Sequence, residues 1–127
     1  MDKERFERGL AKRKATLGAD YVERSLAQAD DFNRPFQELV TEFCWGFGWG
    51  DERLDAKTRS MLNLTMIAAL NRMHEWELHF RGALKNGVTS GELQAILHQI
   101  AIYCGIPAGV ECFRIARKVL AETEPSA

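Results

Sequence analysis

Residues Thr89–Gly105 read "TSGELQAILHQIAIYCG", and this stretch indicates the fold class most clearly. Thr89 and Glu92 have the spacing of a capping box, in which each side chain accepts a hydrogen bond from the other residue's backbone N–H at the start of a helix. Apolar residues then recur every three or four positions, which is the period of one helix face. Gly105 and Pro107 end the pattern, so the stretch predicts one amphipathic helix. Its apolar stripe comprises Leu93, Ile96, Leu97, Ile100, Ala101 and Cys104.

Helical periodicity continues over nearly all of the remaining chain, and no alternating strand pattern is evident. We therefore predict an all-α fold of about six to seven helices. Asn33 is expected to cap a helix that stops within "CWGFGWG" (residues 44–50), where three glycines disfavour helix. The segment "MLNLTMIAAL" (residues 61–70) is apolar almost all round, which predicts burial on every side, by other helices of the chain or by another subunit. The other expected helices span residues 1–15, 20–29, 55–71, 73–86 and 108–121.

The composition is that of an ordinary globular protein. With 127 residues, 46% of them hydrophobic, the chain is expected to form a single domain over residues 1–127 with its own core. A net charge of -1 argues against nucleic-acid or anionic-membrane partners. No apolar run is long enough to cross a membrane, and the charged N-terminus lacks a secretion signal, so a cytoplasmic protein is expected.

The three cysteines, Cys44, Cys104 and Cys112, are widely spaced and form no CxxC motif. A thioredoxin-type redox site or a zinc knuckle is therefore not indicated. Because cysteine is among the residues most often buried, we expect free, buried thiols.

The most polar short segment is "MHEWELHF", Met73–Phe80. His74 and His79 are five residues apart, which places them about 140° apart around a helix, on different sides. Zinc proteases instead space two histidines four residues apart on one face. No metal site is therefore predicted.

Glu75 and His79 do share a helix face, because they are four residues apart. A carboxylate beside an imidazole raises the pKa of the imidazole and can fix its tautomer, which suits proton transfer near neutral pH. The pattern also fits a structural ion pair at the border of the buried face. Residue pattern alone leaves both interpretations open.

Two further features have alternative interpretations. Arg59 lies near the start of the very apolar helix, where it either faces solvent or binds a carboxylate through its guanidinium group. Trp45 and Trp49, among the glycines of "CWGFGWG", either close one edge of the core or line a small-molecule pocket.

Taken in order, these segments resemble the 4-carboxymuconolactone decarboxylase family, within the AhpD-like superfamily. The resemblance extends from about Gly9 to Leu120. It is carried by "LGADYV", "CWGFGW", "LDAKTRSMLNLTMIAALNR", "HEWELHFRGALKNGVTSGEL" and "HQIAIYCGIPAG". It implies an all-helical protein that assembles into homotrimers or homohexamers, with pockets at or near subunit contacts.

The resemblance also implies a carboxy-lyase that needs no cofactor, acts on a lactone in the catabolism of aromatic compounds through the beta-ketoadipate pathway, and yields the enol-lactone of 3-oxoadipate. His79, with its pKa adjusted by Glu75, would then donate the proton. Arg59 would bind a substrate carboxylate, with Arg72 and Arg81 as further cations. Trp45 and Trp49 would form an apolar wall, and either a histidine N–H or backbone N–H groups of the Gly46–Gly50 turn would stabilise the developing negative charge.

One departure from the superfamily is informative. AhpD-type members carry CxxC with a histidine four residues after its second cysteine. Here Arg72 and Glu75 stand at the corresponding positions before His79, so thiol–disulfide chemistry is not expected. Two alternatives to the decarboxylase remain: an enzyme of the same fold acting on another lactone or oxo acid, and a non-catalytic oligomeric small-molecule binding protein.

Overall fold

The computed structural model describes residues 1–123, and in this range the chain forms seven α-helices, one π-helix and no strand. The predicted all-α class is therefore confirmed. The chain divides into two compact units, Met1–Ala56 and a second that begins at Lys57. Each unit is described below by itself, and the predicted single domain over residues 1–127 stays a prediction.

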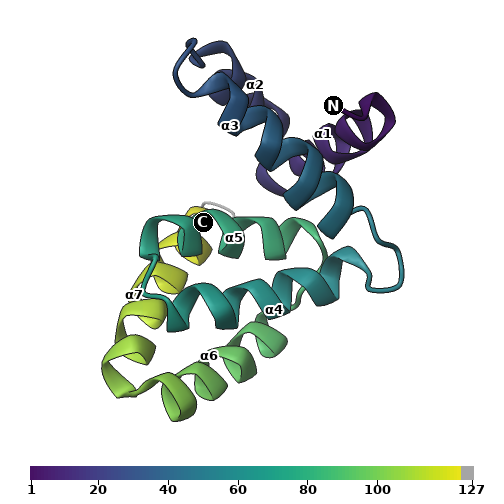
Figure 1. Ribbon diagram of the computed structural model, residues 1–127. Helices are drawn as coiled ribbons and strands as arrows, with labels where there is room; N and C mark the ends of the chain where they lie inside the picture. Colours follow the sequence, from purple (N-terminus) through teal and green to yellow (C-terminus); the bar gives the residue numbers. More distant parts are fainter. Residues whose placement is uncertain (124–127) are drawn as a thin grey trace. The chain divides into compact units, whose positions relative to one another are not determined.

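The first unit contains α1 (Lys3–Leu17), α2 (Ala19–Ala27), α3 (Arg34–Leu39) and η1 (Val40–Gly48) (Figure 1). The Asp2 side chain caps α1 by accepting a hydrogen bond from the backbone N–H of Arg5, at 3.0 Å. Gly18 separates α1 from α2 and has a φ of 98°, a conformation that costs glycine little. The first two helices thus end and begin close to the predicted residues.

Helix α3 continues directly into η1, a π-helix in which the backbone N–H of Trp49 bonds to the carbonyl of Cys44, five residues back, at 3.1 Å. The helix passes through Gly46 and ends at Gly48, inside the predicted stretch. Asn33 occupies the predicted N-cap position of α3, but its side chain does not cap the helix. Its Oδ1 instead accepts from the backbone N–H of Asp30, at 2.8 Å.

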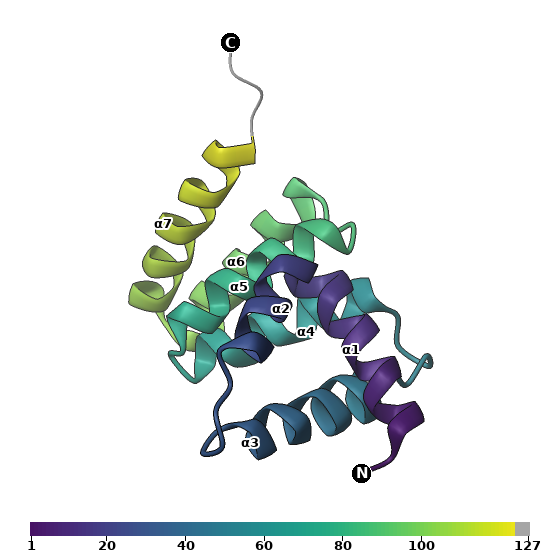
Figure 2. The same ribbon diagram turned by 90° about the horizontal axis from the view of Figure 1, so that it is seen from above.

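Helices α1 and η1 cross at two glycines, Gly9 and Gly46 (Figure 2). A Cβ added to Gly9 would overlap the carbonyl oxygen of Thr41 and lie 2.6 Å from the backbone nitrogen of Gly46. The two backbones can approach this closely only because both residues lack a side chain. The crossing fixes which face of η1 is turned toward α1.

The second unit contains α4 (Ala56–Ala69), α5 (Met73–Lys85), α6 (Ser90–Cys104) and α7 (Ile106–Thr123) (Figure 1). The predicted capping box of α6 is present in full, with both the Thr89 and the Glu92 bonds made. The core of this unit draws on all four helices. Its largest buried side chains are Leu64, Trp76, Phe80, Leu93, Leu97, Ile100 and Val119.

Within one chain, helix α4 buries a single face, that of Ser60, Leu64 and Ala68. Burial on every side would need a second subunit, so that expectation stays a prediction. The backbone carbonyl of Leu64 accepts a hydrogen bond from the indole N–H of Trp76, at 3.0 Å, which ties α4 to α5. On the other side of α4, large apolar side chains are exposed, namely Leu62, Met66 and Leu70.

The cysteines correct one expectation from the sequence. All three are free, but only Cys112 is buried, whereas Cys44 and Cys104 are exposed. Burial raises the pKa of the Cys112 thiol to about 11. Among the described residues, each helix is too short or too polar to cross a bilayer.

Candidate functional site

Helix α5 carries the predicted proton-handling pair. Glu75 lies in the first turn of α5 and is exposed, and His79 lies one turn later and is half-buried. A carboxylate in the first turn is favoured because it faces the positive end of the helix dipole. The neighbouring face of α5, about 100° around the helix axis, carries Trp76 and Phe80, which are fully buried and stack with a centroid separation of 5.2 Å. The pair therefore stands at the edge of the core, as its spacing predicted.

The surroundings of His79 set its protonation. Burial lowers the pKa of the His79 imidazole below its usual value, and the negative charge of Glu75 acts in the opposite direction. The sequence correctly indicated the effect of Glu75, but the net direction is the reverse of the expected one. Removal from water disfavours the charged ring more strongly than Glu75, itself exposed, can favour it. At rest, His79 is therefore biased toward its neutral form.

Two predicted cations lie in the same unit as this pair. Arg59 is half-buried in α4, directly before Ser60, whose hydroxyl accepts a hydrogen bond from the Asn86 amide at 3.0 Å. Arg72 is exposed and occupies the N-cap position of α5. Its backbone carbonyl accepts from the N–H of Trp76 at 2.9 Å, so the backbone at Arg72 is held in place while its guanidinium group faces solvent.

Arg81, the remaining candidate cation, is already engaged. Its guanidinium group binds Glu77 at 3.0 Å and Glu122 at 2.7 Å. Glu77 also accepts from Lys118 at 3.2 Å, and the hydrogen bond from Arg81 lowers the pKa of the Glu77 carboxyl. This network links α5 to α7, so Arg81 and Glu77 have a structural role. His74 is exposed on α5.

The two predicted aromatic residues belong to the first unit. Trp45 and Trp49 lie one turn apart on η1 and at its end, and their rings stack with centroids 4.7 Å apart. Both side chains are buried. A buried, mutually stacked pair fits closure of a core edge. The structure thus brings Glu75 and His79 together on one helix and Trp45 and Trp49 together on another.

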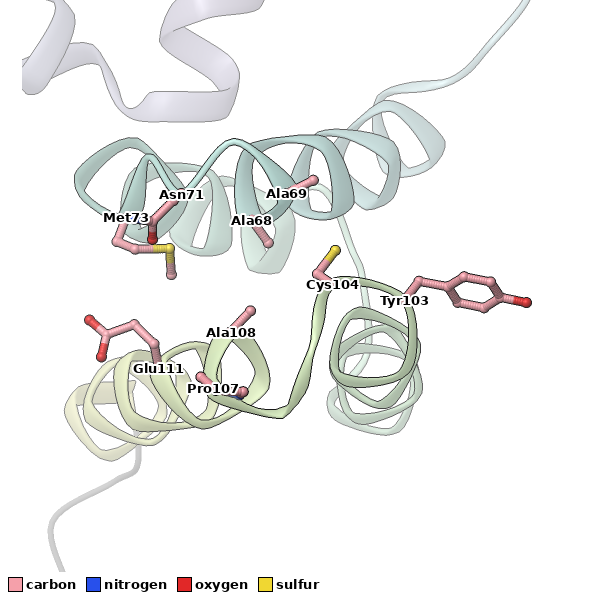
Figure 3. A pocket seen from close by; sticks show the side chains of 9 residues that line it. All are labelled: Ala68, Ala69, Asn71, Met73, Tyr103, Cys104, Pro107, Ala108 and Glu111. Carbon is pink, nitrogen blue, oxygen red and sulfur yellow. The ribbon is translucent and has the colours of Figure 1, made fainter.

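A cavity of about 460 Å³ lies in the second unit, between the α4–α5 turn and the α6–α7 junction (Figure 3). Figure 3 shows Met73 and Glu111 pointing toward each other across it, whereas Tyr103 points away. Its lining contains none of the six residues predicted for the site, although both neighbours of Arg72 contribute to it. Its one charged lining residue is Glu111, whose carboxylate is paired with Arg114 at 2.6 Å, and the lining offers no cation for a substrate carboxylate. We therefore do not assign this cavity to the substrate.

Sequence patterns do not indicate this cavity, because its walls come from two helix junctions that are distant along the chain. Gly105 and Pro107 marked only the second junction. At the first, Asn71 has a φ of 57°, which is uncommon for a residue other than glycine and is not evident from the sequence. Within residues 1–123, no group of three His, Cys, Asp or Glu side chains is arranged to hold a metal ion.

Comparison with known proteins adds independent information. The model of the carboxymuconolactone decarboxylase family matches residues 34–118. A nitrosuccinic acid decarboxylase of Metarhizium robertsii is 44% identical over 116 residues, which cover 91% of this chain and 80% of that protein. A 4-carboxymuconolactone decarboxylase of Acinetobacter baylyi is 36% identical over 118 residues, which cover 93% of this chain and 88% of that protein.

These two relatives are both decarboxylases, and each aligns with more than nine-tenths of this chain. Their names differ in the substrate, a nitro acid in one case and a carboxylated lactone in the other. The comparison therefore supports the predicted enzyme class, a carboxy-lyase.

Proposed function

This chain belongs to the carboxymuconolactone decarboxylase family, and we propose that it decarboxylates a small dicarboxylate without a cofactor, with 4-carboxymuconolactone as the first candidate substrate. In this proposal, His79 and Glu75 handle the proton, and Arg59 binds a substrate carboxylate with help from Arg72. Nitrosuccinate is the second candidate, because the relative named for it is 44% identical to this chain.

The two candidate substrates share a chemical pattern. In both, the carbon that loses carbon dioxide also bears a carboxymethyl group, –CH₂COO⁻. In both, an acceptor takes up the electron pair released when the C–C bond breaks. In 4-carboxymuconolactone the pair passes through the ring double bond to the lactone carbonyl, and in nitrosuccinate it passes to the nitro group. Protonation at carbon then completes each reaction.

This pattern defines what the protein must supply. A cation must hold the carboxymethyl group, hydrogen-bond donors must stabilise the developing oxyanion, and an acid must protonate carbon. Arg59 and Arg72 are suited to the first requirement, because guanidinium groups bind carboxylates in a bidentate manner. A histidine N–H is the candidate for the second, because the segment of residues 46–50 belongs to the first unit and its Trp49 N–H is already bonded to the Cys44 carbonyl. Trp45 and Trp49 were predicted to form an apolar wall, but they are buried and stacked on each other in the first unit, so they are not part of this proposal.

His79 is the candidate acid, and its burial supports a change of protonation during the cycle. Burial lowers the pKa of the free His79 ring. A bound dianion adds negative charge nearby, which would raise this pKa and favour the protonated ring when a proton is needed. Glu75 is exposed and so could return a proton from solvent. The Glu75–His79 pair on α5 is the observation that carries this proposal.

The activity is tested by adding the purified protein to each substrate separately. Loss of the ultraviolet absorbance of 4-carboxymuconolactone and release of carbon dioxide from nitrosuccinate give kcat/KM for each. A higher kcat/KM for the lactone is expected, and a higher value for nitrosuccinate would support the second candidate. If neither compound is consumed, the substrate is a different one and both assignments fail.

The role of His79 is tested by His79→Gln, with His74→Gln as the matched control at an exposed position of the same helix. Loss of a general acid typically lowers kcat by about 10² to 10⁴. Full turnover by His79→Gln would refute the assignment. Glu75→Gln should shift the pH profile of kcat/KM toward lower pH, because Glu75 raises the pKa of His79.

A further inference from the structure

A cavity of about 520 Å³ lies between α6 and α7, and it shares no lining residue with the cavity of Figure 3. We name it the Arg117 cavity. Its apolar lining residues are Ala101, Ile106, Gly109, Val110 and Phe113, and its charged ones are Arg114 and Arg117. Neither Glu75 nor His79 belongs to this lining. A mostly apolar hollow with a few charged groups is the usual form of a small-molecule site.

The Arg117 cavity lies where two small residues let the helices approach. A Cβ added to Gly109 would be 2.6 Å from the Cβ of Ala101, so α6 and α7 are in close contact at this point. In the same lining, Ile106 and Val110 are 68% and 63% exposed, and Phe113 is half-buried. An apolar ligand that covers these side chains would remove them from water, which favours binding.

Arg117 is the charge that this cavity offers to a ligand. Arg114, the other cation of the lining, donates to both carboxylate oxygens of Glu111, at 3.1 Å and 2.6 Å. Lys118, next to Arg117 in the chain, binds Glu77 at 3.2 Å. Within residues 1–123, Arg117 is exposed and forms no ion pair. Its guanidinium group is therefore available to bind a ligand carboxylate through two parallel hydrogen bonds.

The charge and the apolar surface are separated along α7. Ile106 is the first residue of α7, and Arg117 lies about 16 Å further along the helix axis. A second cavity, of about 200 Å³, also has Phe113 and Arg117 in its lining, so the guanidinium group borders open space there too. A ligand that matches this arrangement has a carboxylate at one end and an unbranched apolar chain, which fits the length better than a single ring.

We propose that the Arg117 cavity binds a medium-chain aliphatic carboxylate, such as decanoate. The carboxylate lies on Arg117, and the chain follows α7 over Val110 toward Ile106. Binding is charge-assisted at one end and apolar along the rest. The ligand differs from the candidate substrates, which are small and carry two carboxylates, so this inference is independent of the proposed catalytic activity.

Calorimetric titration of the full chain tests the ligand class. Decanoate, kept below its micelle concentration, should saturate one site per chain. Decyltrimethylammonium has the same chain with the opposite charge, and butyrate has the same head group with a shorter chain. Each should bind at least about tenfold more weakly than decanoate.

Two results of this titration would overturn the proposal. One is a titration with decanoate that does not saturate, whether the cavity is too open to hold the chain or another subunit covers it. The other is equal affinity for either control compound, because the charge or the chain would then play no part.

Arg117→Gln tests the position of the carboxylate. The matched control is Lys85→Gln, at an exposed residue of the second unit outside the cavity. Arg117→Gln should weaken decanoate binding by about tenfold or more, because hydrogen bonds from a charged group are lost. Lys85→Gln should bind decanoate as the wild type does. Wild-type affinity in Arg117→Gln would overturn the proposal.

Val110→Glu tests the path of the chain, because it places a carboxylate in the apolar part of the cavity. The control is Leu70→Glu, at a similarly exposed apolar residue of the second unit outside the cavity. Val110→Glu should bind decanoate at least about tenfold more weakly, whereas Leu70→Glu should bind it normally. Circular dichroism verifies that the variants keep their helices. Unchanged affinity in a Val110→Glu protein with full helix content would overturn the proposal.

Discussion

Replacing Gly9 with alanine should destabilise the first unit, although alanine is the better helix former by about 1 kcal/mol. A Cβ at this position would overlap the Thr41 carbonyl oxygen and lie 2.6 Å from the Gly46 nitrogen. Nonbonded heavy atoms approach to about 3.5 Å, so α1 must withdraw from η1 by about 1–1.5 Å. Both obstructing groups belong to the backbone, which cannot rotate away as a side chain could.

Overpacking of this kind costs about 1–3 kcal/mol, which exceeds the gain in helix propensity. We therefore expect a net loss of up to about 2 kcal/mol and a fall in Tm of up to about 10 °C for a domain of this size. The assay is thermal and urea unfolding followed by circular dichroism and by tryptophan fluorescence, since Trp45 and Trp49 both lie in the first unit.

The matched control is Gly91→Ala in the first turn of α6. No atom lies within 4 Å of a Cβ at Gly91, so only the propensity gain of up to about 1 kcal/mol remains. This variant should melt at or slightly above the wild-type temperature. If Gly9→Ala is as stable as Gly91→Ala, close packing at the α1–η1 crossing does not stabilise the first unit, and the reasoning fails.

Three further predictions concern the second unit. Burial lowers the pKa of His79 in the folded protein. The contribution of the neutral His79 ring to stability is therefore complete above the pKa of histidine in the unfolded chain, about 6.5, and it is lost as the pH falls through that value toward the lower folded pKa. Urea unfolding at about pH 7 and about pH 5 should therefore show a smaller acid-induced loss of stability for His79→Gln than for the wild type, and equal losses would contradict this. Iodoacetamide should modify the exposed Cys104 readily, whereas the buried Cys112, with its pKa of about 11, should react only on unfolding. Mass spectrometry measures the labelling, and modification of both thiols in the native protein would contradict the prediction. Thr89→Ala removes the bond from the backbone N–H of Glu92, at 3.1 Å, and should lower the free energy of unfolding by about 1 kcal/mol in urea titrations, whereas Ser90→Ala should change it little.

Local sequence signals located most helix boundaries, because the groups that end a helix are close neighbours along the chain. The capping box at Thr89 and the glycine stops at Gly87 and Gly105 depend only on residues a few positions apart. The helix through "CWGFGWG" extends to Gly48 because Gly46 fits against α1. Glycine disfavours helix, but at Gly46 the close contact with α1 requires a residue without a side chain.

In the candidate site, too, local spacing was predictable from the sequence, whereas burial and long-range contacts were not. Spacing alone placed Glu75 and His79 on one face of α5, and it separated His74 from them. It could not give the direction of the His79 pKa, because that depends on how much water the fold removes from the ring. Nor could it show that Arg81 is engaged by Glu122, which lies 41 residues further along the chain.

The sequence by itself determined the all-helical class, the pairing of Glu75 with His79 and the resemblance to a decarboxylase family, because periodicity, short spacing and ordered motifs are properties of a linear chain. Only the tertiary structure decided which faces one chain buries by itself: Ser60, Leu64 and Ala68 on α4, Cys112 but neither Cys44 nor Cys104, and the side of η1 that meets α1. Burial depends on which helices meet, and the close approach at Gly9 and Gly46 selects the face of η1 that meets α1.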